Sequence, residues 1–230
     1  MSTVFEKELK DLKETVLKLG SMVEKAINDA IKSLVERNSI LATETIDRDP
    51  AVNAIDVEID ETCIRLIALR QPRAGDLRLI TTAMKITTDL ERIGDLAVDI
   101  AERVLELNEE PQLKPYIDIP KMAEIAQGMV RDALDAFVKR DSALAREVLM
   151  RDDAVDNLNW NVFNELLSYM INDPSNISRA TRITYISKYL ERIADHATNI
   201  AEMVVYLVEG KIIRHVTPEQ STLNHGRISP

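Results

Sequence analysis

The chain contains two related repeats of one helical sequence. Residues 90–95 read LERIGD and residues 190–195 read LERIAD, so five of six positions agree at a spacing of 100 residues. With an offset of 103, residues 29–52 also align with residues 132–155, and twelve of these positions are identical. Repeated sequences build repeated structural units, which restricts the possible folds strongly. We therefore expect two equivalent units within the 230 residues.

The spacing of apolar residues predicts that these units are helical. Only 4% of the residues are aromatic and only six are glycine, which is typical of an aliphatic, all-α protein. Apolar residues recur at alternating spacings of four and three, which places them on one face of a helix that packs into a bundle. This stripe comprises Leu79, Ala83, Ile86, Leu90, Ile93, Ala97, Ile100, Val104 and Leu107, and in the second repeat Ile183, Ile186, Leu190, Ile193, Ala197, Ile200, Val204 and Leu207.

Each repeat is expected to form three helices, so that the fold class is all-α with two tandem three-helix bundles. The first helix is predicted near residues 5–46 and 120–148. The second should begin at a capping aspartate, Asp49 or Asp152, and run to a proline. The predicted units are a first bundle at 1–110, a linker at 111–119, a second bundle at 120–210 and a C-terminal tail at 211–230, with Gly210 ending the last helix.

Composition excludes several classes of protein. The net charge of −10 argues against a nucleic-acid partner, since affinity for nucleic acid comes mainly from neutralising phosphates. No apolar run approaches the ~18 residues of a membrane-spanning helix, and the N-terminus lacks the apolar region of a signal peptide. We therefore expect a cytoplasmic protein without direct membrane insertion. The single cysteine, Cys63, lies among apolar residues and is expected in the core.

Acidic side chains gather on one face of the second and third helices. Residues spaced three or four apart are neighbours on a helix, and like charges at this spacing cost about 0.2–0.5 kcal/mol per pair. No basic residue belongs to these bands, and in the second repeat Asn159 and Phe163 stand at the positions of Asp56 and Asp60. The bands comprise Glu91, Asp95, Asp99 and Glu102 with Asp49, Asn53, Asp56 and Asp60, and in the second repeat Glu191, Asp195, Asn199 and Glu202 with Asp152 and Asp156.

The acidic bands have two interpretations that spacing alone leaves open. One is an ordinary solvated helix face. The other is a metal site, because a short connection makes the second and third helices antiparallel neighbours, and converging carboxylates repel unless they are protonated or bind cations. Oxygen ligands suit Mg, Mn, Ca and Fe, and in some sites Zn, and so many acids can hold more than one ion.

Motifs for catalysis are absent from the sequence. It has no P-loop, no dinucleotide-binding glycine motif, no nucleophile elbow and no pair of the Glu-x-x-His motifs of di-iron bundles. We expect a protein that is not an enzyme, with a metal-dependent phosphohydrolase as the alternative. His196 is interpreted as a boundary residue within reach of the second acidic patch. Trp160, which replaces Val57 of the first repeat, is interpreted as a packing or interface residue.

Three long segments resemble the PhoU family of bacterial phosphate-signalling regulators. They are IDETCIRLIALRQPRAGDLRLI (59–80), TTDLERIGDLAVDIAERV (87–104) and YLERIADHATNIAEMVVYLVEGKIIRH (189–215), and the resemblance extends from Phe5 to His215. It implies two three-helix bundles with pseudo-twofold similarity, a cytoplasmic and commonly dimeric protein, and metal clusters on (E/D)xxxD motifs.

The resemblance also implies a ligand set and a function. Glu91 with Asp95, Glu191 with Asp195, and Asp56 with Asp60 match the motif, while the acidic start of the second helix is matched by Asp49, Asn53, Asp152 and Asp156. Asn159, Phe163 and Asn199 depart from it, so the second patch is expected to hold fewer or weaker ions. The implied function is negative regulation of the phosphate-starvation response and of phosphate uptake. The implied partners are the ATPase subunit of the phosphate transporter and a membrane sensor histidine kinase.

Overall fold

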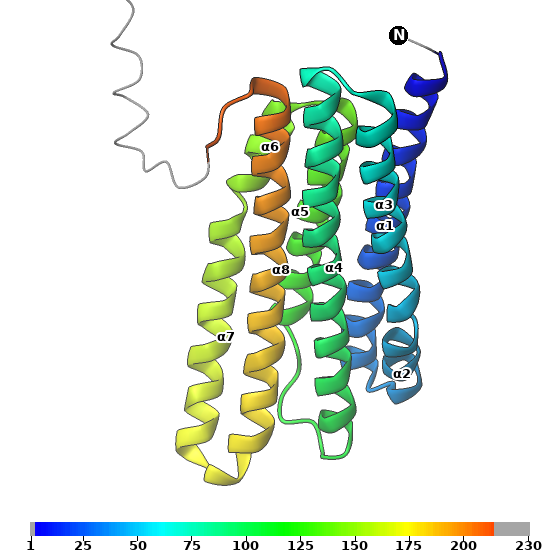
Figure 1. Cartoon of the computed structure of the whole chain (residues 1–230). Coiled ribbons are helices and arrows are strands. Elements are labelled where there is room, and N and C mark those ends of the chain that lie inside the picture. The colour runs from blue at the N-terminus through cyan, green and yellow to red at the C-terminus, as the bar shows by residue number, and fades with distance from the viewer. Residues whose placement is uncertain (1–2, 214–230) are drawn as a thin grey trace, which may run out of the picture.

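The computed structural model describes residues 3–213, and within this range the chain is helical and contains no strand. Two repeats of four helices follow one another, which confirms the all-α tandem fold (Figure 1). The first repeat comprises α1 (Thr3–Glu36), α2 (Ser39–Asp47), α3 (Asp49–Arg70) and α4 (Ala74–Asn108). The second comprises α5 (Asp118–Lys139), α6 (Ser142–Leu149), α7 (Asp152–Asn172), a 3-10 turn (Pro174–Asn176) and α8 (Ile177–Glu209).

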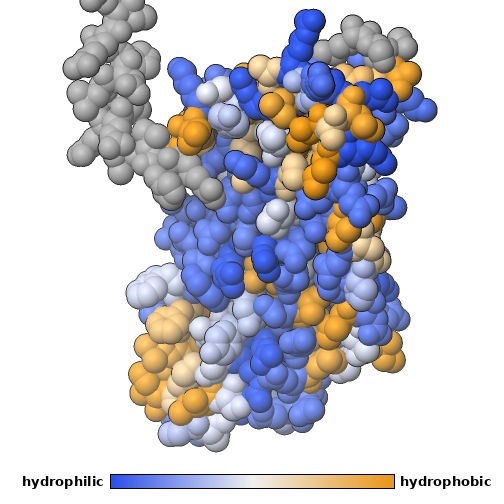
Figure 2. Space-filling model, viewed as in Figure 1, coloured by the Kyte–Doolittle hydropathy of each residue, from blue (hydrophilic) through white to orange (hydrophobic). Residues whose placement is uncertain are grey.

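The longest helix of each repeat lies at the centre of the molecule. In Figure 1, α7, α8, α4 and α3 stand side by side, and α5 and α1 pack behind them. The third helices of the two repeats, α4 and α8, run antiparallel against each other. This arrangement relates the repeats by an approximate twofold axis, because it exchanges α4 with α8 and α3 with α7. Figure 2 shows that the surface viewed from this side is mostly hydrophilic, apart from apolar residues that include a group over the lower half of α7.

The predicted first helix is broken in both repeats, so the prediction of one helix over 5–46 and 120–148 was wrong. The chain leaves α1 through Arg37 at φ 54° and leaves α5 through Arg140 at φ 55°, both left-handed. Asn38 then caps α2 by accepting a hydrogen bond from the Leu41 amide at 3.0 Å, and Asp141 caps α6 in the same way. A capping residue followed by serine inside an apolar pattern was the signal for this break.

The predicted caps of the second helices were also wrong. The N-cap positions of α3 and α7 belong to Arg48 and Arg151, which make no capping hydrogen bond, so Asp49 and Asp152 are the first helical residues. Each arginine instead reaches back to an acid of the first helix: Arg48 Nη1 lies 2.8 Å from Asp29 Oδ2, and Arg151 Nη1 lies 2.6 Å from Asp132 Oδ2. The two ion pairs connect the start of α3 with α1 and the start of α7 with α5. They leave the carboxylates of Asp49 and Asp152 available for other contacts.

The predicted apolar stripes form the core. All stripe residues of α4 and α8 are buried, and Ile93 and Ile193, the isoleucines of the two LERI(G/A)D segments, are completely inaccessible. Gly210 ends α8 with φ 70°, as expected. The predicted tail lies largely outside the described residues, and so do His215 and His225.

Cys63 is buried in the core as expected, and burial, reinforced by the Asp60 carboxylate, raises the pKa of its thiol to about 12. Since the thiolate is the reactive form, native protein should not react with an aromatic disulfide reagent at about pH 8. Unfolding in denaturant should release one reactive thiol per chain. Rapid labelling of the native protein would contradict the buried position.

Candidate metal site

Five of the predicted ligands lie together where α3 packs beside α4. Each is half-buried, and we call the group Asp49, Asn53, Asp56, Glu91 and Asp95 the first acidic cluster. Their proximity changes their acidity. Burial, together with the carboxylates of Asp95, Asp56 and Asp49, raises the pKa of Glu91, and the guanidinium of Arg92 opposes this shift. Burial and Asp95 raise the pKa of Asp49, while a hydrogen bond from Asn53 lowers it. The two helices therefore bring like charges into contact, as the spacing predicted.

Two oxygen atoms of the first acidic cluster are buried and lack a hydrogen-bond partner among the described residues. They are Asp49 Oδ1 and Asn53 Oδ1. The neighbouring atoms of the same side chains are paired, since Asn53 Nδ2 donates to Asp49 Oδ2 at 2.8 Å. A buried oxygen without a donor costs about 1–3 kcal/mol. An arrangement of this kind fits a site that gains a cation.

Basic residues reach into both acidic bands, contrary to the prediction that the bands contain none. Arg92 Nη1 donates to Asp95 Oδ2 at 3.1 Å, and Arg92 Nε lies 3.4 Å from Glu91 Oε2. In the second repeat Lys188 Nζ donates to Glu191 Oε1 at 2.6 Å. Arg92 and Lys188 are next to the acidic bands on their helices, and their side chains are long enough to reach the carboxylates. The prediction considered only which residues share a helix face, so it did not include this reach. Exposed pairs of this kind are worth little, so a cation can displace them.

Two predicted ligands of the first repeat lie at the edge of the first acidic cluster. Asp60 is one turn beyond Asp56, and burial together with Asp60 raises the pKa of Asp56. Asp99 lies towards the α4–α8 interface, where burial, Glu102 and Asp95 raise its pKa while Arg103 and Arg192 lower it. The arginine of the second repeat thus partly compensates the charge of Asp99.

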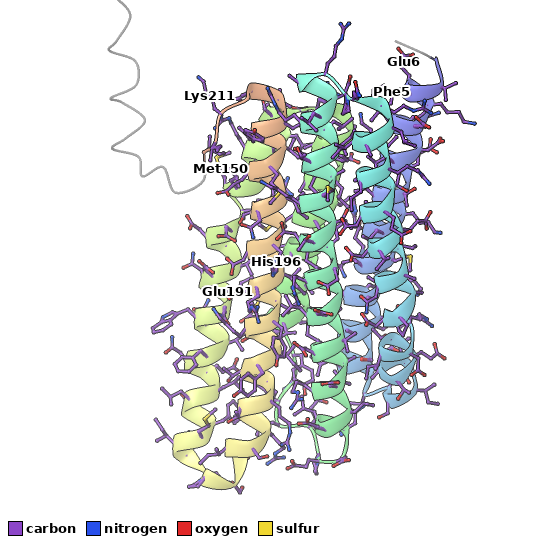
Figure 3. The ribbon with its side chains drawn as sticks, viewed as in Figure 1. Phe5, Glu6, Met150, Glu191, His196 and Lys211 are labelled. Carbon is purple, nitrogen blue, oxygen red and sulfur yellow. The ribbon has the colours of Figure 1, made fainter. Side chains whose placement is uncertain are left out.

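The second acidic cluster, Asp152, Asp156, Glu191 and Asp195, occupies the equivalent place where α7 packs beside α8. Burial and the carboxylates of Asp195 and Asp156 are the main causes that raise the pKa of Asp152 to about 6. Asp156 and Asp195 are exposed, unlike their counterparts in the first repeat. In Figure 3, Glu191 lies in the region between α7 and α8. The second acidic cluster is therefore more open.

The three departures from the acidic pattern have other contacts. Asn159 Oδ1 accepts a hydrogen bond from Ser187 Oγ at 2.8 Å, and Phe163 is partly exposed on α7. Asn199 Nδ2 donates to Asp89 Oδ1 across the α4–α8 interface at 3.3 Å. His196 Nδ1 lies 2.8 Å from the same oxygen, in the interface between the two central helices (Figure 3). Asn199 and His196 thus connect the repeats, a role that the spacing within one repeat did not reveal.

The raised pKa of Asp152 predicts how stability depends on pH in metal-free protein. Because the folded-state pKa of about 6 exceeds the unfolded value of 3.8, this group favours folding at low pH and loses that contribution as the pH rises through 6. Asp152→Asn should raise the free energy of unfolding at about pH 7 by about 1 kcal/mol, after discounting for solvent screening, and have little effect near pH 4. Urea unfolding of chelator-treated protein at the two pH values measures this; an equal gain at both would contradict it.

The described residues contain no preformed group of three or more His, Cys, Asp or Glu side chains arranged for a metal ion. The chemistry of the first acidic cluster nevertheless fits one. Its donors are all oxygens, two of them are buried and unpaired, and its carboxylates raise one another's pKa. Oxygen-only donor sets suit hard cations such as Mg²⁺, Mn²⁺ or ferric iron.

The repeats correspond to two matches with one family model. The model described as the PhoU domain matches residues 16–104 and 119–204, which together make up most of the chain. The chain belongs to the PhoU family. Each match covers one of the two bundles, so the internal repeat is a duplicated PhoU domain.

Similar proteins support this assignment over nearly the full length. A PhoU homolog of Aquifex aeolicus, named as a phosphate-specific transport system accessory protein, is 46% identical over 91% of this chain and 95% of its own. The crystal structure of PhoU from Pseudomonas aeruginosa has a TM-score of 0.87 at 43% identity, covering 90% of this chain and 100% of that chain. PhoU from Streptococcus pneumoniae has a TM-score of 0.85 at 32% identity, covering 91% and 99%.

The names of these relatives describe accessory and regulatory proteins, which agrees with the expectation that the chain is not an enzyme. No helix within residues 3–213 combines the length and hydrophobicity of a membrane-spanning segment.

Proposed function

We propose that this PhoU-family chain is an accessory protein of a phosphate-specific transport system and restrains phosphate uptake and the phosphate-starvation response. It acts in the cytoplasm as a homodimeric helical adaptor between the ATPase subunit of the transporter and a membrane sensor histidine kinase. Support comes from the full-length similarity to proteins that carry the accessory name and from an almost entirely helical architecture. The acidic surface is compatible with basic protein partners and disfavours nucleic acid.

The adaptor function includes metal binding at the acidic clusters. The observation that carries this part is the pair of buried, unpaired oxygens of Asp49 and Asn53 beside carboxylates whose pKa values are raised. A cation there would be held by Asp49, Asn53, Asp56, Glu91 and Asp95, and would neutralise charges that otherwise repel. The second acidic cluster, with Asp152, Asp156, Glu191 and Asp195, is expected to bind more weakly because it is more exposed.

Elemental analysis tests the metal directly. Protein purified without an affinity tag should contain Fe, Zn, Mn or Mg at one or more ions per chain, and Asp49→Ala combined with Asp95→Ala should lose most of it. Glu147→Ala, an exposed acid on α6 outside both clusters, is the matched control and should retain the metal. Substoichiometric metal in all three proteins would contradict the site.

A genetic experiment tests the regulation. In a host whose own PhoU-family gene is deleted, a phosphate-starvation reporter should stay on in high phosphate, and expression of this chain should switch it off. The Asp49→Ala, Asp95→Ala variant should restore repression poorly at equal protein level. A reporter that ignores the chain would argue against the proposed role. Metal-dependent hydrolysis of a phosphate ester, lost in Glu91→Ala, would favour the phosphohydrolase alternative.

A further inference from the structure

The outer face of α7 carries an exposed apolar seam. Trp160, Phe163, Leu167 and Ile171 follow one another at spacings of three, four and four, so they form one row along the helix. Their exposed fractions are 64%, 39%, 39% and 71%, and Trp160 stacks on Phe163 with ring centroids 6.0 Å apart. The apolar residues over the lower half of α7 in Figure 2 belong to this region. Such a row resembles the contact face of a helix pair whose partner helix is not present.

A groove next to the seam extends this surface onto α8. It has a volume of about 450 Å³, and Trp160, Phe163 and Tyr185 line it together with the charged residues Asp156, Lys188 and Glu191. Tyr185 is 51% exposed and stacks on Tyr189 with centroids 6.2 Å apart. The aromatic surface is therefore two helices wide.

In the first repeat the corresponding row is interrupted by an acid, although Val57 and Ile64 there are 55% and 60% exposed. The position of Phe163 is occupied there by Asp60, and that of Trp160 by Val57. An uninterrupted row of four large apolar residues is therefore present only on α7, and the fold that both repeats share does not explain it. The second repeat thus carries an aromatic side chain, Phe163, where the first repeat carries the acid Asp60.

The charge around the seam indicates which partner fits it. Each chain carries a net charge of −10, so most faces of two molecules repel. From Asn157 to Asn172 the only charged residue is Glu165, and its carboxylate pairs with Lys114 of the same chain. The polar residues beside the seam are mainly asparagines. Along the row itself a basic partner would find little to pair with, and a second molecule of the same chain would bring few like charges together, since Asp156 and Glu191 lie at one end of the surface and Lys188 lies beside them.

The order of the side chains is self-complementary. When two such helices pack antiparallel about a twofold axis, a residue i that contacts j is matched by j contacting i. With the axis midway along the seam, Trp160 meets Ile171 of the other molecule, and Phe163 meets Leu167. Each large ring then faces an aliphatic side chain, which allows both to interdigitate.

We propose that the α7 seam is the homodimer interface, formed by two antiparallel α7 helices. This inference rests on the homodimer included in the proposed function and assigns its surface. At about 150–250 Å² per aromatic side chain, the exposed parts of Trp160, Phe163 and Tyr185 supply on the order of 300 Å² per molecule. Leu167, Ile171 and the asparagines add to this, towards the roughly 800 Å² per partner of a standard interface with an apolar core and a polar rim.

The chain contains its own reporter, because Trp160 is its only tryptophan. Sedimentation velocity over a dilution series should show dimers that dissociate, and the fluorescence maximum should shift to longer wavelength over the same range as Trp160 becomes solvated. Phe163→Asp introduces the acid that the first repeat carries at this position and should weaken dimerisation at least tenfold. Ile171→Asp should do the same, since Ile171 meets Trp160 of the other molecule.

Leu69→Asp is the matched control, because Leu69 is 71% exposed on α3 and lies off the seam; it should dimerise like the wild type. Circular dichroism establishes that each variant is folded. A dimer that survives both Phe163→Asp and Ile171→Asp would overturn the assignment of this face and leave the proposed homodimer standing. A wild-type protein that is monomeric at every concentration would overturn both.

Discussion

Removal of bound metal is expected to lower the melting temperature of the purified protein by roughly 5–10 °C. A ligand that binds only the folded state stabilises it by about 2.7 kcal/mol at one hundred times its dissociation constant. For a chain of this size 1 kcal/mol corresponds to about 2–4 °C. The physical source is the first acidic cluster, where a cation would relieve the repulsion among Asp49, Glu91 and Asp95 and pair the buried oxygens of Asp49 and Asn53. Calorimetry before and after chelator treatment measures the change.

A double substitution isolates the first acidic cluster in this experiment. Glu91→Gln with Asp95→Asn removes two charges while keeping the shapes of the side chains. The variant should melt above the metal-free wild type, because its repulsion is gone, and should respond less to chelator. The pair Asp135→Asn with Glu147→Gln removes the same number of charges from helices α5 and α6 and should respond like the wild type. Equal chelator responses in all three proteins would count against the site.

His196→Ala is expected to lower the free energy of unfolding by about 2–4 kcal/mol. Its Nδ1 atom lies 2.8 Å from Asp89 Oδ1, and Asp89 is only 8% exposed in the centre of the α4–α8 interface. Without the imidazole the buried carboxylate would keep Asn199 Nδ2, at 3.3 Å, as a weaker donor. Urea unfolding measures the loss, and proteolysis should reveal whether the two repeats separate before they unfold.

Replacing both partners should restore most of this stability. The approximate twofold axis relates His196 to Leu96, which is buried, and Asp89 to Tyr189. The symmetry-related position in the α4–α8 interface therefore contains no acid–histidine pair. Asp89→Leu with His196→Leu should therefore lie within about 1 kcal/mol of the wild type. A double variant as unstable as the sum of the two single losses would show that the pair is not coupled.

The fold was largely predictable from the sequence, because the same helical spacing of apolar residues occurs in both repeats. The buried stripes from Leu79 to Leu107 and from Ile183 to Leu207 confirm this. The breaks at Arg37 and Arg140 were missed because an apolar pattern continues across them, while the decisive feature is one left-handed residue followed by a cap. A helix cap depends on one hydrogen bond and hardly changes the spacing of apolar residues along the sequence.

The candidate site was predictable only within each repeat. The spacing along each helix, with the short connection between the second and third helices, predicted that Asp49 would lie near Glu91 and Asp95, and the structure places them close together. Contacts between the repeats could not be predicted in this way, because they depend on how α4 and α8 meet. The contact between the amide of Asn199, a member of the predicted acidic band, and Asp89 on the other repeat is one example. Arg92 and Lys188 were overlooked because long basic side chains reach beyond their own helix face.

The antiparallel contact of α4 and α8 gives a single polypeptide the architecture of a symmetric dimer. In a true homodimer every substitution occurs in both subunits. A change that suits a function of one subunit therefore also alters the other. Fusion into one chain removes that constraint. Asp60 in one half and Phe163 at the equivalent position of the other illustrate this freedom: the two halves share a scaffold, yet one presents a charge where the other presents an aromatic ring.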